Sequence, residues 1–371
     1  MQTSRVVPVA ALAALFVACG GSGTNGEGGG GTGQGGGASG NRVATVVSAG
    51  PSHTCAVVSG SARCWGDGDH LGNQLVSGSA VPVQVIGLTS GVTSVVAGCQ
   101  TCAVVDGGVQ CWGSSAPVQV SGLGGPVEAL ATGCGHACVI VNGGVQCWGS
   151  NEAGELGSNS LDDSDVPVQV VGLTSGVTSV SAGDDYTCAV VNGGVQCWGA
   201  NTVWQLGIGS NVLSLSRVPV QVSGLTSGVT SISAGAVHTC AVVDGGAQCW
   251  GGGAFGRLGT GPGRDGPVPA QVIGLTSGVV SVSAGDAHTC AVVDGGVQCW
   301  GYNHWGQLGN NSTTDSDAPV QVSGLTSGVT SASAGGVHTC AVVNGGVQCW
   351  GAGIGNGTGS DSAVPVPVTG L

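Results

Sequence analysis

Short apolar segments separated by glycine-rich turns recur along the chain from residue 42 onward. The best-formed copies read GLTSGVTSVSAG, then two variable residues, then HTCAVVDGGVQCWG, then a variable loop and PVQV. Valine, threonine, glycine and proline dominate these segments, and the 3.6-residue periodicity of an amphipathic helix is absent. The pattern therefore predicts short β-strands and argues against a helical solenoid.

The length of the repeat indicates the architecture. Seven copies follow one another, and most are about 50 residues long. That length, with some four strands in each unit, is typical of β-propeller blades. We therefore predict an all-β fold in which residues 42–371 form a seven-bladed β-propeller of four-stranded antiparallel blades.

Each copy contains a hairpin whose register follows from its turn. In the sixth copy, Asp294 and Gly295 suit a two-residue type I′ turn. Counting outward from this turn places Cys290 opposite Cys299, at a non-hydrogen-bonded pair where the Cα atoms lie about 4.5 Å apart. The same register holds at the other turns, which are Ser59-Gly60, Asp106-Gly107, Asn142-Gly143, Asn192-Gly193, Asp244-Gly245 and Asn344-Gly345.

Two cysteines nine residues apart face each other in every predicted hairpin. We predict a disulfide in each, and therefore an oxidising compartment. Each bond closes a ring of about ten residues, worth about 2.5–3 kcal/mol in the chain-entropy account. Metal ligation is the alternative, but two cysteines per blade around a ring do not converge on a tetrahedral site. The predicted pairs are Cys55 with Cys64, Cys102 with Cys111, Cys138 with Cys147, Cys188 with Cys197, Cys240 with Cys249, Cys290 with Cys299 and Cys340 with Cys349.

Two further cysteines occupy the loop just before the hairpin in consecutive repeats. We expect a disulfide between Cys99 and Cys134 that joins two blades. The same loops also hold Cys102, His136 and Cys138, and Cys99 and Cys102 form a C-x-x-C motif. A redox or zinc site is therefore a second interpretation, and unpaired thiols are a third.

The N-terminus has the features of an export signal. Arg5 precedes an apolar run that is too short to span a bilayer, and the sequence LFVACG around Cys19 resembles the lipobox of bacterial lipoproteins. We interpret residues 1–18 as a lipoprotein-type signal peptide, Cys19 as the lipid attachment site and residues 19–41 as a Gly-rich tether with a reach of about 25 Å. Cleavage of an ordinary secretory signal near Ala18 is the alternative. We expect an exported bacterial protein, either an outer-membrane or cell-surface lipoprotein or a secreted one.

Composition excludes several functions. The net charge is −13, there is no lysine, and the six arginines are scattered, so nucleic acid is not an expected partner. Glutamate occurs only four times, which leaves little for general acid–base chemistry, and no catalytic triad or phosphate loop is present. We predict no catalytic residues, no cofactor and no metal.

The repeats resemble the regulator-of-chromosome-condensation (RCC) repeat family. The resemblance rests on Ser283-Ala284-Gly285, His288-Thr289, Trp300-Gly301 and Gly306-Gln307-Leu308-Gly309, and it covers about 330 residues. It implies a seven-bladed propeller of four-stranded blades. The founding member is a guanine-nucleotide exchange factor for a nuclear GTPase. We do not expect exchange activity here, because this chain is exported and acidic and lacks a long wedge-like insertion.

How the ring closes is open from sequence. The chain starts on an inner-strand motif at 43–50 and ends on an outer-strand motif at 364–371. We favour the arrangement in which each PVQV strand joins the following blade, so that the C-terminus completes the first blade. In the alternative, each strand joins its own blade and closure relies on side-chain packing alone.

Several recurring residues have structural interpretations. We expect the histidines that precede the hairpins to hydrogen-bond within their own blades, and the tryptophans after the second cysteines to pack in the core. Aspartate groups at 162–165 and 315–317 are expected to form turns, with calcium binding as the alternative. The histidines are His53, His136, His238, His288 and His338, and the tryptophans are Trp65, Trp112, Trp148, Trp198, Trp250, Trp300 and Trp350.

Specific function is expected where the repeats differ. The loops after each Trp-Gly carry the candidate binding residues Trp204, Phe255, Tyr302, Asn303, His304 and Trp305. Our leading interpretation is a monomeric, surface-tethered, non-enzymatic module that binds an extracellular protein or glycan and meets the membrane only through its lipid anchor. Packing of these loops against neighbouring blades is the simpler alternative for the aromatics.

Two other functions remain open. The first is a propeller lyase or hydrolase with a site in an axial funnel, for which the pre-hairpin loops supply Asp184, Asp185, Asp286 and His288. The second is a purely structural repeat protein of the cell envelope.

Overall fold

A computed structural model describes residues 43–74, 76–209, 214–263 and 265–371. They belong to one compact unit, Asn41–Leu371. The predicted signal peptide, the Cys19 lipid site and the tether fall outside the described residues. Within the described part, no helix has the length and apolar character needed to cross a membrane.

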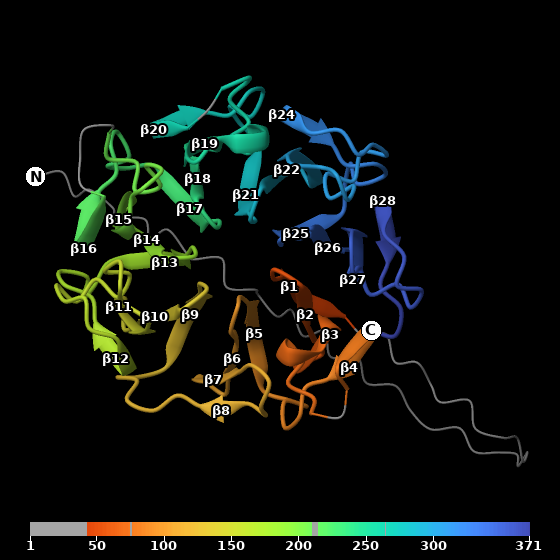
Figure 1. The fold of residues 1–371 in the computed structure, drawn as a ribbon, viewed down its shortest axis with the longest axis horizontal. Helices are drawn as coiled ribbons and strands as arrows, with labels where there is room; N and C mark the ends of the chain where they lie inside the picture. Colours follow the sequence, from red (N-terminus) through yellow and green to blue (C-terminus); the bar gives the residue numbers. More distant parts are fainter. Residues whose placement is uncertain (1–42, 75, 210–213, 264) are drawn as a thin grey trace, which may run out of the picture. The chain divides into compact units, whose positions relative to one another are not determined.

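Seven four-stranded antiparallel sheets, each made of consecutive strands, stand around a central axis (Figure 1). The first three blades are β1 (Ala44–Ala49), β2 (His53–Val58), β3 (Ser61–Asp67) and β4 (Gly78–Gln84); β5 (Val92–Ala97), β6 (Thr101–Val105), β7 (Gly108–Trp112) and β8 (Val118–Gln119); and β9 (Val127–Thr132), β10 (His136–Val141), β11 (Gly144–Gly149) and β12 (Ser164–Gln169). The next two are β13 (Val177–Ala182), β14 (Tyr186–Val191), β15 (Gly194–Ala200) and β16 (Leu215–Gln221); and β17 (Val229–Ala234), β18 (His238–Val243), β19 (Gly246–Gly251) and β20 (Gly266–Gln271). The last two are β21 (Val279–Ala284), β22 (His288–Val293), β23 (Gly296–Gly301) and β24 (Ser316–Gln321); and β25 (Val329–Ala334), β26 (His338–Val343), β27 (Gly346–Gly351) and β28 (Ser362–Pro367). Short 3₁₀ turns, η1 (Gly68–His70) and η2 (Ala254–Gly256), lie in the loops of blades 1 and 5. The predicted fold is confirmed.

The hairpin register is the one predicted from the turns. In blade 6, Asp294 and Gly295 have φ angles of 50° and 80°, the left-handed values of a type I′ turn, and Cys290 pairs with Cys299. The Cα atoms of that pair are 4.0 Å apart, as at a non-hydrogen-bonded position, and a disulfide joins them.

A disulfide closes the hairpin of every blade, as predicted. Both cysteines of each pair are buried, so the bonds lie inside the apolar clusters of the ring. In blade order they join Cys55 to Cys64, Cys102 to Cys111, Cys138 to Cys147, Cys188 to Cys197, Cys240 to Cys249, Cys290 to Cys299 and Cys340 to Cys349. The paired sulfurs leave none of these cysteines available as a metal ligand, which was the alternative interpretation.

The favoured arrangement for ring closure is wrong. Each outer strand pairs within its own blade, and the C-terminal β28 pairs with β27 rather than completing blade 1. The reason is visible in blade 6, where the Gln321 side-chain amide donates to the carbonyls of Val297 and Leu325, and Val297 N–H donates to Leu325 O. These bonds hold the outer strand, and the segment that leaves it, against the third strand of the same blade.

Blades 7 and 1 therefore close the ring as neighbours. Gly336 N–H donates to Gly50 O, and Ala49 N–H donates to Ser333 Oγ, over 3.1 and 2.9 Å. Trp65 of blade 1 packs with the Cys340–Cys349 disulfide of blade 7 in one apolar cluster. Closure uses hydrogen bonds as well as side-chain packing.

The hydrophobic core lies between blades rather than at the axis. In the cluster between blades 6 and 7, Trp350 packs with Cys290, Cys299 and Leu308 of the preceding blade. Its indole Nε1–H donates to Gln307 O over 2.8 Å, which satisfies the polar atom of a fully buried aromatic. The seven tryptophans are buried core residues, as predicted.

Candidate functional site

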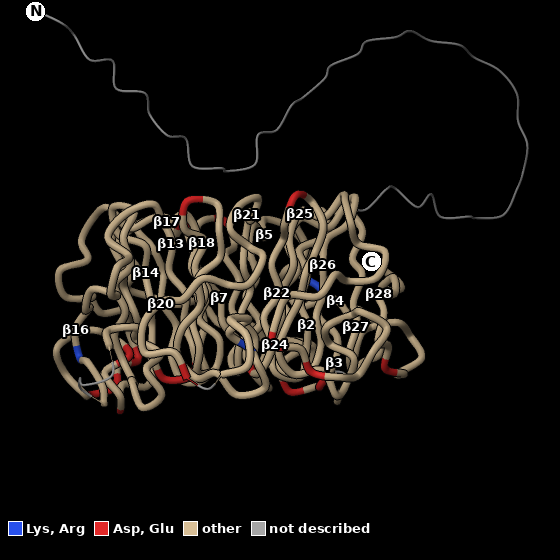
Figure 2. The backbone as a smooth tube through the Cα atoms, turned by 90° about the horizontal axis from the view of Figure 1, so that it is seen from above, with Lys and Arg blue, Asp and Glu red and all other residues tan. Residues whose placement is uncertain are grey.

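One face of the ring collects the variable segments. Because the strands are antiparallel, the loops joining first to second and third to fourth strands of every blade emerge on the same side, here called the loop face. The opposite side, the turn face, carries the type I′ turns. Among the described acidic residues, all but Asp106, Glu128, Asp244 and Asp294 lie in or beside the loops of the loop face, at the lower edge in Figure 2.

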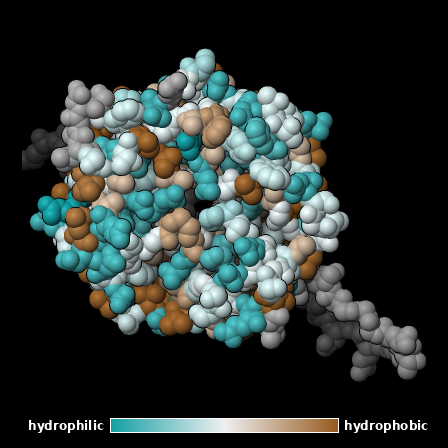
Figure 3. Space-filling view, in the orientation of Figure 1, coloured by the Kyte–Doolittle hydropathy of each residue, from teal (hydrophilic) through white to brown (hydrophobic). Residues whose placement is uncertain are grey.

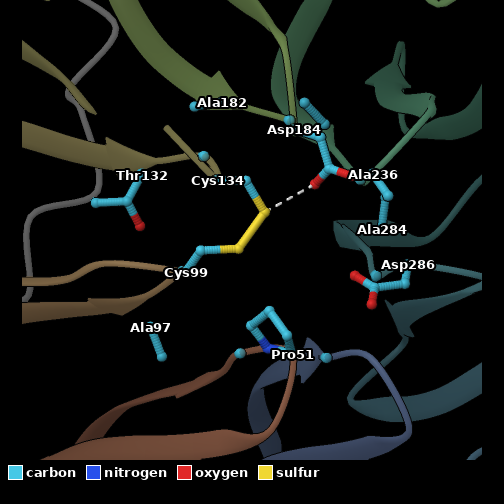
Figure 4. A pocket seen from close by; sticks show the side chains of 18 of the residues that line it. Pro51, Ala97, Cys99, Thr132, Cys134, Ala182, Asp184, Ala236, Ala284 and Asp286 are labelled. Carbon is cyan, nitrogen blue, oxygen red and sulfur yellow. Dashed lines mark hydrogen bonds between the residues drawn. A yellow bond between two sulfur atoms is a disulfide. The ribbon is translucent and has the colours of Figure 1, made fainter. Parts of the chain in front are cut away.

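A small axial pocket opens at the centre of the loop face. It has a volume of about 90 Å³ and is walled by the glycines and alanines that end each inner strand. Pro51, Cys99, Cys134, Asp184 and Asp286 stand around it (Figure 4), and a small opening is visible at the centre of the ring in Figure 3. Sites for small molecules enclose roughly 300–1,000 Å³. The axial pocket therefore accommodates a few water molecules rather than an organic substrate.

The two carboxylates at this pocket are hard to ionise. Desolvation, together with the negative charges of Asp286 and Asp185, raises the pKa of Asp184 to about 6. Burial also raises the pKa of Asp286, against the opposing charge of Arg257. Arg257 Nη1–H donates to the backbone carbonyl oxygen of Asp286 over 2.8 Å.

The four residues of the enzyme hypothesis do not come together. Asp184 and Asp286 border the axial pocket, but Asp185 lines a separate cavity of about 320 Å³ with Glu152 and Glu155. His288 is buried between blades. The axial-funnel site is thus not assembled in the way its sequence positions suggested.

The recurring histidines bond to the next blade, not to their own as predicted. His288 Nε2–H donates to Thr339 Oγ1 over 2.8 Å, and Thr339 Oγ1–H donates to Gln307 O. Because the threonine proton is already used, His288 must be the donor, which fixes its neutral tautomer. Burial, followed by the charge of His338, lowers the pKa of His288 to about 3. The sequence repeat revealed the recurring histidine position but not its hydrogen-bond partner. Thr339 follows His338 in blade 7, and the sequence does not show that this threonine faces His288 of blade 6.

Cysteines and histidines near Cys99 do not gather into a metal site. Cys99 is joined to Cys134, the expected bond between blades, while Cys102 and Cys138 are held in their own hairpin disulfides. His136 bonds to Thr187. Across the described residues, no three metal-ligating side chains come together.

The candidate binding residues form an aromatic cluster on the rim of blades 5 and 6. Phe255 and Trp305 are 52 and 48% exposed, and His304 is exposed as well. The ring centroids of Phe255 and Tyr302 are 5.0 Å apart, and those of Tyr302 and His304 are 4.7 Å apart. Three aromatic rings therefore line up across two neighbouring loops.

Asn303 does not belong to that surface. Its side chain is fully buried, its amide donates to Ser312 O and Thr314 O, and its Oδ1 accepts from Leu308 N–H. It holds the loop in shape and has no polar atom left for a ligand, so its place among the binding residues was wrong. Asn151 bonds in the same way in blade 3.

Backbone strain accompanies two of the aromatics. Trp204 and Phe255 have φ angles of 62° and 61°, in the left-handed region that bulky residues avoid. Trp204 precedes the Gln-Leu-Gly box at the position where Gly154 and Gly306 stand in blades 3 and 6, also with positive φ. Such outliers persist only where the surroundings impose them, and they cluster at functional sites.

The fold and these sites identify the class of protein as a disulfide-bonded β-propeller of RCC1-type repeats. The family described as Regulator of chromosome condensation (RCC1) repeat matches residues 142–190, 192–242, 244–292 and 294–342, and a second profile of the same description matches 279–307. The chain belongs to the RCC1 repeat family. No curated protein sequence matched it.

Solved structures share the fold at low identity. Human WBSCR16 is 21% identical with a TM-score of 0.72, over 81% of this chain and 86% of that one. Prp20, the yeast RCC1 crystallised with Kap60, is 21% identical with a TM-score of 0.74, over 88% and 85%. The ectodomain of the receptor kinase CR4 from Physcomitrella patens is 19% identical with a TM-score of 0.51, over 84% and 74%.

Proposed function

We propose that this chain is an exported, non-enzymatic binding module that takes a protein partner on its loop face, with a glycan as the alternative ligand. The observation that carries the proposal is the run of ring contacts from exposed Phe255 through half-buried Tyr302 to exposed His304, with exposed Trp305 next in the chain. Exposed aromatics of this kind are enriched at binding hot spots.

The charge around the aromatic cluster predicts the charge of the partner's binding surface. Asp315 Oδ1 accepts from Asn303 N–H, and Asp265 Oδ1 accepts from Gly253 N–H, so both carboxylates lie at the base of the aromatic loops. Most of the acidic residues that the structure describes lie at the loop face, at the lower edge in Figure 2. An acidic field steers basic surfaces towards it, and aromatic faces attract arginine and lysine. The partner surface is therefore expected to be basic.

Relatives in fold give a precedent for protein partners. The structure of Prp20p from Saccharomyces cerevisiae is described with its binding to Gsp1p and histones, and Prp20 has been crystallised with Kap60. The axial pocket, at about 90 Å³, is too small for the organic substrate that the axial-funnel enzyme requires.

Export is the second part of the proposal. The hairpin disulfides suit an oxidising compartment outside the cytosol. We assign residues 1–18 as the signal, Cys19 as the acylated residue and 19–41 as the tether. A Cys19→Ser variant should leave the membrane fraction and fail to incorporate a labelled fatty acid. Incorporation equal to wild type contradicts the lipid anchor and leaves the binding proposal intact.

Affinity capture tests the binding surface. Wild type and a Phe255→Ala/Tyr302→Ala/Trp305→Ala variant are used to capture proteins from envelope extracts, and the captured proteins are identified by mass spectrometry. Val280→Ala, a change in a 64% exposed residue of β21 away from the loops, is the matched control. We expect wild type and control to retain the same partner and the triple variant to lose it.

Three outcomes would overturn the assignment. Equal capture by the triple variant would exclude the aromatic cluster. Binding to a glycan array but not to protein would select the alternative ligand. Loss of every partner even for wild type favours a structural envelope protein.

A further inference from the structure

Neighbouring blades are joined by three recurring hydrogen bonds, and the seam between blades 6 and 7 has all of them. His288 bonds to Thr339 Oγ1, Ala334 N–H donates to Ser283 Oγ, and Trp350 Nε1–H donates to Gln307 O. The distances are 2.8, 2.9 and 2.8 Å. Each bond crosses from one blade to the next and satisfies a buried polar group.

The other regular seams keep at least two of these bonds. At the seam of blades 4 and 5, Tyr186 takes the place of histidine, and its hydroxyl accepts from Thr239 while donating to His238 O. Blades 3 and 4 keep the histidine bond and a tryptophan bond from Trp198 to Glu155 O. Blades 7 and 1 keep the histidine and serine bonds.

The seam between blades 2 and 3 has lost all three bonds within the described residues. Gln100 and Ala137 stand where the other seams have histidine and threonine, and Val96 replaces the serine. Blade 2 also lacks the loop whose carbonyl would accept from Trp148, since β7 leads into β8 after a few residues. A backbone bond from Val127 N–H to Gly107 O remains.

The eighth disulfide crosses this same seam. Cys99 precedes β6 of blade 2 and Cys134 precedes β10 of blade 3, so their bond ties the two blades where the hydrogen bonds are missing. Figure 4 shows both sulfurs facing the axial pocket. The seam that lacks the three hydrogen bonds is the seam that has the additional disulfide. This indicates that the Cys99–Cys134 bond replaces the missing hydrogen bonds.

This disulfide also differs from the other seven in its access to solvent. Cys134 is exposed and Cys99 is half-buried, whereas no hairpin cysteine is more than 8% exposed. Reactions of disulfides with thiols depend on access to the attacked sulfur. Among the described residues, one solvent-accessible disulfide thus stands beside seven buried ones.

We propose that Cys99–Cys134 is a thiol–disulfide exchange site for external dithiols, and that its oxidation state latches or releases the seam of blades 2 and 3. A dithiol thiolate attacks the exposed Cys134 sulfur, and the Cys99–Cys134 bond breaks. Its electron pair stays on the Cys99 sulfur, which takes up a proton. The second thiol of the reagent then displaces Cys134, leaving two protein thiols and an oxidised cyclic disulfide. The protein gains two electrons and two protons, and the dithiol loses them.

The neighbouring carboxylate affects the rate of this exchange. Asp184 Oδ1 lies 3.4 Å from Cys134 Sγ (Figure 4). A negative charge there repels the incoming thiolate and opposes charge on the departing sulfur. Asp184→Asn should therefore accelerate reduction of this bond and leave the hairpin disulfides unaffected.

Limited reduction of the full chain tests the exchange site. The oxidised protein is treated with dithiothreitol under native conditions, quenched with an alkylating reagent and mapped by mass spectrometry. Cys99 and Cys134 should be labelled together at least about tenfold faster than the hairpin pairs, because the attacking thiolate reaches them directly. Labelling of hairpin cysteines at an equal or greater rate overturns the exchange site.

Hydrogen exchange tests the latch separately. A Cys99→Ser/Cys134→Ser variant, and wild type after limited reduction, should both exchange faster along 92–105 and 127–141. The corresponding segments 279–293 and 329–343 at the regular seam of blades 6 and 7 should be unchanged and provide the internal control. Unaltered exchange at both seams overturns the latch. Neither experiment requires a partner, so the result stands apart from the proposed binding function.

Discussion

The turn face and the loop face are built from the same seven repeats but differ in what varies. On the turn face, the first residue of every type I′ turn has a φ between 49° and 52°, and a disulfide closes each hairpin. On the loop face, the segments differ in length, carry most of the acidic residues and expose Phe255 and Trp305. The same ring thus holds a repeated scaffold and a non-repeated surface.

The comparison separates residues that stabilise from residues that are free to bind. His288 Nε2, the Asn303 amide and Trp350 Nε1 lie in or under the loops, yet each donates a hydrogen bond within the ring. Phe255 and Trp305 are exposed beside them. Position on the variable face is therefore not sufficient for a binding role, and burial with satisfied hydrogen bonds marks the exceptions.

The largest expected effect is the loss of folding stability of the propeller at acidic pH. Burial lowers the pKa of His53 and His288 to about 3 and of His136 and His338 to about 4, from an ordinary value of 6.5. The unfolded chain binds protons that the folded ring does not, so stability is complete above pH 6.5 and is lost as the pH falls towards about 4. At about pH 5.5 each of these imidazoles lowers the free energy of unfolding by about 1 kcal/mol. Urea unfolding at neutral and acidic pH measures the sum.

A single substitution checks the sign of that effect. His288→Gln copies the residue that blade 2 has at Gln100 and removes one proton-binding group from the unfolded chain. Between neutral pH and about pH 5.5, the free energy of unfolding of the variant should fall by about 1 kcal/mol less than that of wild type. Asp184, with a pKa raised to about 6, acts in the opposite sense and gains stability as it protonates. An identical pH slope in variant and wild type contradicts the histidine explanation.

Two tryptophans in blade 6 offer the next contrast. Trp300 is fully buried and donates to Arg257 O, whereas Trp305 is 48% exposed. Trp300→Ala should lower the free energy of unfolding by about 3–5 kcal/mol through the cavity it leaves. Trp305→Ala should change it by less than about 0.5 kcal/mol and reduce partner capture. Comparable destabilisation by both variants would show that Trp305 is also a packing residue.

A hairpin disulfide should contribute less than a buried tryptophan. Removing both sulfurs in Cys290→Ala/Cys299→Ala loosens the unfolded chain across a short ring, for a loss of about 2–3 kcal/mol. The type I′ turn at Asp294 already holds the strands together, so the loss should fall at or below this range. Chemical unfolding of the oxidised variant measures it. An unchanged free energy of unfolding would mean that the turn alone fixes the hairpin.

The hairpins could be predicted from sequence because local residues determine them. Asp294-Gly295 specifies a turn, the turn specifies a register, and the register brings Cys290 to Cys299. Ring closure could not be predicted in this way, since the PVQV motif is the same in either arrangement. It depends on tertiary bonds such as those from Gln321 to Val297 and Leu325.

The candidate site was predictable by region but not by residue. Variation between repeats located the loop after Trp300-Gly301. It did not show that the adjacent residues Tyr302 and Asn303 point in different directions. Asn303 turns inward to bond the loop backbone, while Tyr302 contacts Phe255 and His304. Which of two adjacent loop residues is exposed depends on the loop conformation, and no periodic pattern specifies that conformation.

The smallest expected change in the free energy of unfolding concerns Trp204, a half-buried residue that both shapes its loop and is a candidate binding residue. Its φ of 62° is left-handed, and glycine occupies the matching position in blades 3 and 6. Trp204→Gly should relieve about 1 kcal/mol of backbone strain, while the lost side-chain contacts of this half-buried ring offset part of the gain. The free energy of unfolding is therefore expected to stay within about 1 kcal/mol of wild type as partner capture falls. Trp204→Ala, which keeps the strain and loses the ring, is the matched control and should be the less stable of the two. If glycine instead destabilises the ring more than alanine does, packing of Trp204 holds the loop, and the strain carries no functional meaning.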